Sequence, residues 1–279
     1  MAKPWTPPTG RISANRRSFA EVVRDLRYCV FSVMRLRADP PGQNQRHMIW
    51  GLGSGFFVAP NTFLTCNHVM NAARFPHQEG DIYQLIRNAG TAVQSITIPA
   101  VGIGQQLHPF PDFDAAILQT PANNPQPYSA VGYEDTAEGL EIGVAGYPLS
   151  QITPGPNGEP QYNGVVYRVA KGVVTSTVRQ RLSPIPDPQT AELGTVEVNF
   201  LFVPGNSGGP IFDAETGRVL AYVHGFTSRE IIQRIADTSN ENIAAGADPK
   251  HIESLQAVYS LGIKLDNIRG ELEKYGVTL

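Results

Sequence analysis

The chain has 279 residues, of which 41% are hydrophobic, and its 22 basic and 25 acidic side chains give a formal net charge of −3. This length and composition suffice for one large or two smaller domains with a substantial core. The balanced charge favours neither nucleic acid nor an anionic membrane, and no run approaches the roughly 18 apolar residues of a membrane-spanning helix. We therefore expect no nucleic-acid partner and no membrane contact.

The N-terminal region, residues 1–27, is predicted to hold a flexible segment followed by a short helix. Residues 1–17 are rich in Pro and Arg, which favours flexibility. Ser18 is followed three residues later by Glu21, which matches a capping box and predicts a helix that ends near Arg27. The first residues contain no apolar stretch of signal-peptide length.

Only two cysteines are present, Cys29 and Cys66, so the chain cannot be rich in disulfides. Secreted proteins commonly contain disulfides, whereas reducing compartments keep cysteine thiols free. Together with the N-terminal sequence, this predicts a cytoplasmic location.

Short apolar runs separated by turn residues make up most of the chain. The 27 Gly and 23 Pro indicate many turns, and the runs between them are rich in Val, Ile, Phe and Tyr. This pattern predicts an all-β fold, either a sandwich or a barrel. The clearest predicted strands are 30–36, 93–98, 141–147, 165–169, 196–202 and 219–223.

A polar, Pro-rich stretch at 120–139 is predicted to link two β halves, 28–119 and 140–265. Residues 228–256 read as an insertion in the second half, and segments 228–236 and 249–255 have helical character. Residues 266–279 are predicted to form a C-terminal helix, because Ile268, Leu272 and Tyr275 follow helical spacing.

Three short segments carry residues suited to catalysis. His68 follows an apolar strand, Asp114 directly precedes the apolar run 115–118, and Ser207 lies among glycines. A carboxylate beside a buried strand needs a partner, since burying it alone is costly. Asp112 competes with Asp114, because period-two alternation would place both on one strand face. Asp114 is preferred because it abuts the apolar run.

These segments resemble the three signature blocks of trypsin-like serine proteases. The blocks are Thr-Cys-Asn-His-Val at 65–69, Asp-Ala-Ala-Ile-Leu at 114–118 and Gly-Asn-Ser-Gly-Gly-Pro at 205–210. The Gly-Ser-Gly-Phe lead-in at 53–56 and the Asn before Ser207 are more similar to the bacterial HtrA-type branch. The resemblance implies a chymotrypsin-like fold of two six-stranded Greek-key β-barrels, with an N-terminal helical extension and a C-terminal helix. The site would then lie between the barrels.

The resemblance also assigns roles to these residues. Ser207 would be the nucleophile, His68 the general base, and Asp114 the group that orients the imidazole. The backbone N–H groups of Gly205 and Ser207 would form the oxyanion hole. The expected activity is that of a serine endopeptidase acting on protein or peptide substrates. Asn206 cannot form the ion pair that activates zymogens, so we expect regulation by loops or by an activating protein partner.

Substrate preference is less closely specified by the sequence. The resemblance implies that the pocket is formed by Leu201, Phe202, Val223, His224 and Gly225. No acid lies among these positions, so a Lys or Arg preference is not supported. His224 could recognise a Glu or Gln side chain of the substrate. The favoured interpretation is instead a preference for a small or medium apolar residue before the scissile bond.

Two alternative functions stay open at this point. One is a catalytically silent binding or scaffold module of the same fold, and the other is an esterase, although the Ser207 block is not a nucleophile-elbow pattern. No cofactor and no metal are expected, because none of the six His pairs with another at ligand spacing and no nucleotide-binding glycine loop occurs.

Overall fold

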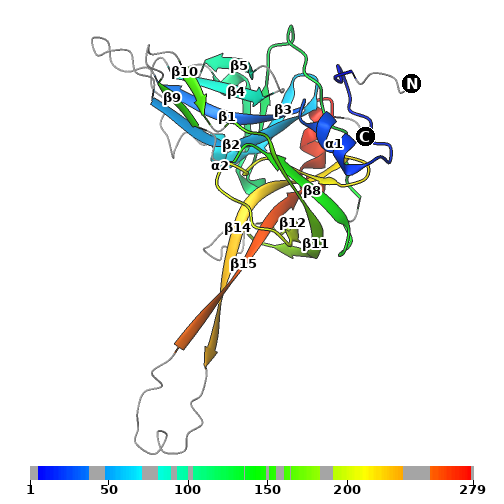
Figure 1. Ribbon diagram of the computed structural model, residues 1–279, viewed down its shortest axis with the longest axis vertical. Coiled ribbons are helices and arrows are strands. Elements are labelled where there is room, and N and C mark those ends of the chain that lie inside the picture. Colours follow the sequence, from blue (N-terminus) through cyan, green and yellow to red (C-terminus); the bar gives the residue numbers. More distant parts are fainter. Residues whose placement is uncertain are drawn as a thin grey trace, which may run out of the picture.

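Two β units make up the molecule, stacked along its long axis, and a β-ribbon projects from the second (Figure 1). The computed structural model describes residues 6–37, 48–70, 81–88, 93–99, 103–134, 136–148, 151–154, 160–163, 165–182, 191–234 and 252–277. Within the part of the chain so described, every helix falls short of the length and apolar content that crossing a bilayer requires. The fold is mostly β and chymotrypsin-like.

The first unit is a curled antiparallel sheet of seven strands in the order β5-β4-β1-β2-β3-β7-β6. Burial follows strand position: all five residues of the central strand β3 are buried, whereas the edge strand β5 buries only Ile96 and Ile98. The strands are β1 Val30–Arg37, β2 Met48–Ala59, β3 Thr62–Cys66, β4 Ile82–Asn88, β5 Val93–Pro99, β6 Leu107–Phe110 and β7 Ala115–Gln119.

The predicted closed six-stranded barrel is wrong for this half. Among the described residues β5 pairs only with β4, and β6 pairs only with β7, so the sheet stays open between them. The 3-10 turn η1 (Ile103–Gln105) separates the two strands. Pro99 in β5 and Pro109 in β6 also lack the N–H that a closing ladder would need.

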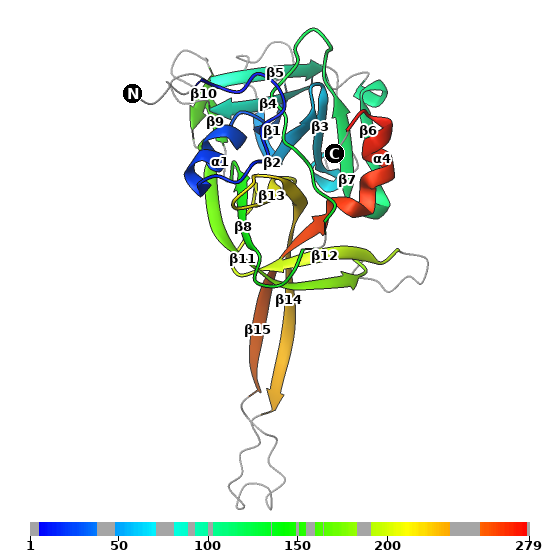
Figure 2. The same ribbon diagram turned by 90° about the vertical axis from the view of Figure 1, so that its right-hand side faces the viewer.

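The second unit is the predicted six-stranded closed barrel, with strand order β11-β12-β15-β14-β13-β8. A separate two-stranded sheet, β9 Gln151–Pro154 with β10 Pro160–Asn163, lies beside the first unit (Figures 1 and 2). The barrel strands are β8 Glu141–Gly146, β11 Arg168–Gln180, β12 Leu193–Val198, β13 Pro210–Asp213, β14 Val219–Arg234 and β15 Ile252–Lys264.

β14 and β15 continue beyond the barrel as a two-stranded ribbon (Figure 2). Their pairing runs from Ala221 with Lys264 to Arg234 with Ile252. The helices predicted at 228–236 and 249–255 are therefore wrong for 228–234 and 252–255. Each strand satisfies the backbone of the other, and this ladder overrides a weak local preference for helix. The remaining residues of the predicted insertion lie outside the described residues.

The N-terminal helix prediction is confirmed. α1 (Phe19–Leu26) begins with the capping box, in which Glu21 N–H donates to Ser18 Oγ at 3.4 Å and Ser18 N–H donates to Glu21 Oε2 at 3.0 Å. Its apolar side packs into the core through Val22 and Leu26, both buried.

Part of the N-terminal segment before α1 packs against the rest of the molecule. Ile12 is buried, and its N–H donates to Tyr128 O at 2.8 Å. Arg17 reaches forward to Asp25 of α1 at 2.5 Å. Ile12 and the Arg17–Asp25 ion pair thus hold this segment against the linker and α1, and Arg17 N–H also donates to Glu215 O at 2.9 Å.

The C-terminal helix is also present, as the 3-10 turn η3 (Leu265–Ile268) followed by α4 (Arg269–Lys274). Ile268 and Leu272 are buried as their spacing predicts. Tyr275 stacks on His108 with ring centroids 4.9 Å apart, and Thr62 Oγ1 donates to Tyr275 O at 3.2 Å. The end of the chain is therefore docked on the first sheet.

The core of the first sheet holds one ion pair that is fully buried. The side chains of Arg35 on β1 and Asp81 before β4 are 1% and 0% exposed, and Arg35 Nη2 contacts Asp81 Oδ2. Removing one partner of such a pair leaves a charge without its counter-charge in a medium of low dielectric constant.

We predict that Asp81→Asn lowers the free energy of unfolding by about 3–5 kcal/mol, because the Arg35 guanidinium stays buried. Denaturant unfolding followed by circular dichroism measures this. The matched control is Glu141→Gln, which removes an exposed pair with Lys171 and should cost about 0–1 kcal/mol. Equal losses in the two variants would contradict the prediction.

Candidate active site

Asp114 occupies a strained position at the entry to β7. The 3-10 turn η2 (Pro111–Phe113) precedes it, and its φ of 46° is the only positive φ of a non-glycine residue in the described chain. Backbone bonds hold it there: Asn67 N–H donates to Asp114 O at 2.9 Å, and Asp114 N–H donates to Pro111 O at 3.0 Å. Such strain persists only where neighbours impose it.

His68 contacts the Asp114 carboxylate at two points. It lies in the short helix α2 (Asn67–Met70), directly after β3. Its backbone N–H donates to Asp114 Oδ1 at 2.9 Å, and its Nδ1 lies 2.7 Å from Asp114 Oδ2. Asp112, the competing acid, is exposed on η2. The structure therefore pairs His68 with Asp114.

Hydrogen bonds keep Asp114 ionised despite its burial. Burial by itself raises the pKa of this carboxyl group, but hydrogen bonds from His224 and His68 outweigh it and hold the pKa well below its usual value. An ionised carboxylate only accepts hydrogen bonds, so the Nδ1 atoms of both imidazoles carry hydrogen. In the neutral form of His68, the ring nitrogen with the free lone pair is then Nε2, the atom that a general base would use.

Ser207 lies in a glycine turn between the second barrel and the first sheet. Gly208 has a φ of 84°, and its N–H donates to Val223 O at 2.7 Å. A Cβ at this position would lie 2.2 Å from Ser54 O and 2.3 Å from Thr65 Oγ1. Conformation and space therefore both require glycine directly after Ser207.

Ser54 on β2 holds this turn, and we did not predict it as a site residue. Its N–H donates to Ser207 O at 2.8 Å, and its Oγ donates to Gly205 O at 2.6 Å. The same Oγ accepts from Tyr147 N–H at 2.9 Å. The only signal in the sequence was the Gly-Ser-Gly lead-in at 53–55.

The N–H groups of Gly205 and Ser207 are left unused by this arrangement. Their carbonyl oxygens accept bonds from Ser54, and neither N–H donates to an acceptor among the described residues. Free backbone donors on either side of a nucleophile can stabilise a developing oxyanion.

The Ser207 hydroxyl is not bonded to His68. It donates to the carbonyl oxygen of His224 at 3.4 Å, and no hydrogen bond joins it to the His68 ring, both residues being described. His224 in turn places its ring against His68, with centroids 5.9 Å apart. The three candidate residues thus share one site through His224, without a hydrogen bond between Ser207 and His68.

The predicted substrate-binding residues fall into different environments. Leu201 is 62% exposed, and Gly225 has no heavy atom within 4 Å of where a Cβ would lie. Phe202 and Val223 are instead buried in the barrel core. His224 Nδ1 lies 2.7 Å from Asp114 Oδ2, so its ring is engaged with the carboxylate.

Cys66, His68 and Asp114 bring their donor atoms within 4.8 Å of one another. Burial raises the pKa of the Cys66 thiol well above its usual value, and its Sγ donates to Val223 O at 3.1 Å. Metals bind the thiolate form. A protonated thiol beside an already paired His and Asp does not fit a metal site.

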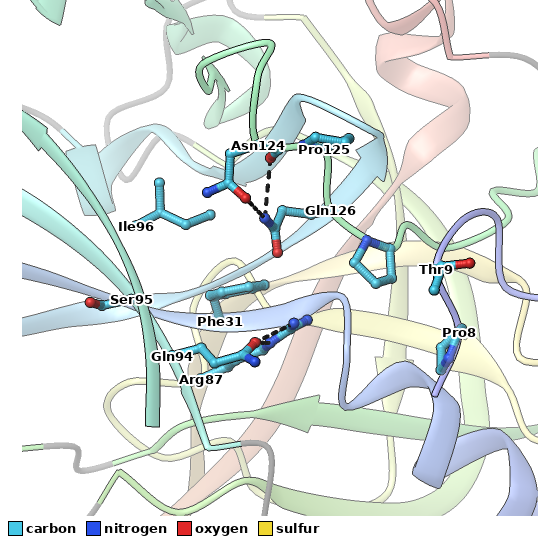
Figure 3. Close-up of a pocket in the computed structure, with 11 residues that line it drawn as sticks. Pro8, Thr9, Phe31, Arg87, Gln94, Ser95, Ile96, Asn124, Pro125 and Gln126 are labelled. Atoms are coloured by element: carbon cyan, nitrogen blue, oxygen red, sulfur yellow. Dashed lines mark hydrogen bonds between the residues drawn. The ribbon is translucent and has the colours of Figure 1, made fainter. Parts of the chain in front are cut away.

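A cavity of about 580 Å³ lies away from these residues, between the N-terminal segment, β5 and the linker (Figure 3). Arg87 is its charged residue, and its guanidinium donates to Gln94 and to Tyr28 O. Because that guanidinium already donates hydrogen bonds to protein acceptors, we assign no ligand to the cavity.

A family described as the trypsin-like peptidase domain matches residues 53–221. The chain therefore belongs to the trypsin-like peptidase family, and the resemblance seen in its sequence is confirmed. A search of curated proteins returns no significant match.

Solved structures of HtrA-type and related proteases have a similar fold. The HtrA-type protease AlgW with a decapeptide is 18% identical, with a TM-score of 0.57 over 92% of this chain and 67% of that one. The active form of the Rv3671c protease from M. tuberculosis is 19% identical, with a TM-score of 0.53 over 100% and 96%. At this identity the likeness establishes the fold alone.

We predict that Ser54→Ala lowers the free energy of unfolding by about 1–3 kcal/mol, because Gly205 O and Tyr147 N–H lose their partner. Thermal and denaturant unfolding measure the change. Ser95→Ala, at an exposed serine of β5, is the control and should stay within about 0.5 kcal/mol of wild type. If Ser54→Ala is as stable as this control, the bonds at Ser54 do not hold the turn.

Proposed function

We propose that this chain is a serine endopeptidase. In this proposal Ser207 attacks the peptide carbonyl, while His68 Nε2 takes its proton and later returns it to the leaving amine. Asp114 holds the imidazole and stabilises the imidazolium, and water then hydrolyses the acyl-enzyme. The observation that carries the proposal is the two-point contact of His68 with Asp114, next to the glycine turn that bears Ser207.

The oxyanion would be bound by the N–H groups of Gly205 and Ser207. In support, neither group has an acceptor in the part of the chain that the structure describes, while Ser54 occupies the two carbonyl oxygens. Loss of one such donor typically lowers turnover about 10²–10³-fold.

We further propose that activity is controlled by loop ordering or by a protein partner, without zymogen cleavage. Asn206 is uncharged, so it cannot pair with a newly released α-amino group. The Ser207 hydroxyl donates to the His224 carbonyl oxygen at 3.4 Å, and it would have to rotate to donate to His68. A small rearrangement of this kind is one that a ligand can drive.

A silent binding module is the second candidate. The observation in its favour is the missing Ser207–His68 hydrogen bond. Against it stand the free N–H groups and the ionised Asp114, which binding alone does not require. Catalytic hydrogen bonds are also often long in ligand-free enzymes.

A cytoplasmic location remains part of the proposal. Its support is that Cys29 and Cys66 are buried free thiols.

Ser207 should react with a fluorophosphonate probe, because His68 and Asp114 activate it. We expect one adduct per chain by intact mass, on a chain with its N-terminus uncut, and no adduct on Ser207→Ala or His68→Ala. A folded chain that stays unlabelled when purified and also in cell lysate, where a partner is present, would support the binding module. Labelling only after N-terminal trimming would overturn the regulatory proposal.

Cleavage should favour a small or medium apolar residue before the scissile bond. The exposed apolar side chains beside the turn are Leu201 and Val203, and His224 is engaged by Asp114. We expect kcat/KM about tenfold or more above that for Glu, Gln or Lys at this position. A panel of peptides that differ only there measures the ratio, and a Glu or Gln preference would contradict it.

A further inference from the structure

One carboxylate oxygen at the candidate site serves two imidazoles. The Nδ1 atoms of His68 and His224 each lie 2.7 Å from Asp114 Oδ2, and the two rings meet edge to face. The other oxygen, Oδ1, accepts the His68 backbone N–H at 2.9 Å. Both Nδ1 atoms must donate, because an ionised carboxylate has no hydrogen of its own.

We propose that His224 is a positioning residue of this site, which fixes the Asp114 carboxylate for His68 and makes the protonation of the base depend on two coupled imidazoles. The inference rests on the proposed function and deepens it. It moves His224 from the substrate pocket, where the sequence placed it, to the catalytic carboxylate.

His224 is itself held where the two β units meet. Its neighbour Val223 pairs with the nucleophile turn, since Val223 N–H donates to Gly209 O at 2.8 Å and Gly208 N–H donates to Val223 O at 2.7 Å. The His224 carbonyl accepts from Ser207 Oγ at 3.4 Å, while its ring reaches Asp114. His224, a residue of the barrel, thus contacts both Ser207 and the Asp114 carboxylate of the first unit.

Charge makes the two rings compete for Asp114. The carboxylate has one negative charge, and either imidazole can take up a proton. If His224 is protonated, it neutralises Asp114, and the imidazolium that must form on His68 during attack loses its support. The two rings therefore share one negative charge through Asp114 Oδ2.

The other titratable groups around this cluster do not add to that titration. Cys66 on β3 and Tyr222 on β14 face the cluster, and burial raises both pKa values well above their usual range. The Tyr222 hydroxyl donates to Phe113 O at 2.6 Å. Asp112 on η2 is exposed to solvent. Among the described residues, the coupled pair is therefore His68 and His224.

The test compares His224→Ala with His224→Asn. The Asn amide can place a neutral N–H donor where Nδ1 lies, whereas Ala places none. Both variants and the wild type are assayed across pH with one peptide substrate, and kcat and KM are separated. Unfolding curves check that each variant is folded.

For His224→Ala we expect kcat to fall about tenfold, with KM nearly unchanged, because one charge-assisted hydrogen bond to Asp114 is lost. The acid limb of kcat/KM should move to higher pH. With His224 gone, the full carboxylate charge acts on His68 and raises its proton affinity, so the base is lost earlier on acidification. His224→Asn should recover most of kcat and reverse the shift of the acid limb.

Two results would overturn the proposal. The first is an unchanged kcat and acid limb in His224→Ala. The second is a rise in KM in both variants that is confined to substrates with one type of residue before the scissile bond. That result would show that His224 contacts the substrate side chain and sets specificity.

Proton NMR separates this inference from the proposed function. Wild type should show two downfield, exchange-protected imidazole N–H signals at low temperature, and His224→Asn should lose one. If two signals are seen but the chain has no peptidase activity, the shared carboxylate is supported. The role of His224 in catalysis is then rejected together with the proposed function. A single signal in an active enzyme would reject the inference alone.

Discussion

The two β units are joined at Ser54, and the candidate site depends on that junction. His68 and Asp114 belong to the first sheet, whereas Ser207 belongs to the second unit, so no strand of either unit can place all three. Ser54 donates to the carbonyls of Gly205 and Ser207 and accepts from Tyr147 N–H. Ser54 and Tyr147 are buried and Gly205 and Ser207 are partly buried, so leaving these hydrogen bonds unmade is costly. The junction therefore fixes the nucleophile turn against β2, and β2 pairs with the strand that leads to His68.

Asp114 is the most demanding residue of the site. Its backbone is left-handed, and its side chain is only 15% exposed. Partners from two elements offset these costs: His68 of α2 and His224 of β14 bond the carboxylate, and Tyr222 of β14 bonds the neighbouring Phe113 O. Bonds with Asn67 and Pro111 of the first unit hold the backbone of Asp114, whereas its carboxylate is shared between His68 of the first unit and His224 of the second. The environment of the carboxylate therefore depends on both β units.

Local signals predicted the features that need only local partners. The capping box at Ser18 is complete within four residues, and Ile268 and Leu272 face the core because helical spacing places them on one side. The errors concern strand pairing. The sheet that should have closed stays open between β5 and β6, and the helices expected within 228–256 are strands where the structure describes them. In each case the outcome depends on which strands pair, and local propensity does not register the pairing partner.

The sequence by itself determined the family, the β character, both helices and the three candidate catalytic residues, since each depends on residue type within a short segment. Only the tertiary structure distinguished Asp114 from Asp112, placed Ser54 under the nucleophile turn and turned His224 toward Asp114. His224 shows the reason most clearly. The same imidazole could read a substrate or bind a carboxylate, and 110 residues separate it from the acid that it contacts. What a polar side chain does is decided by the partner within about 3 Å, and the folding of the two β units onto each other selects that partner.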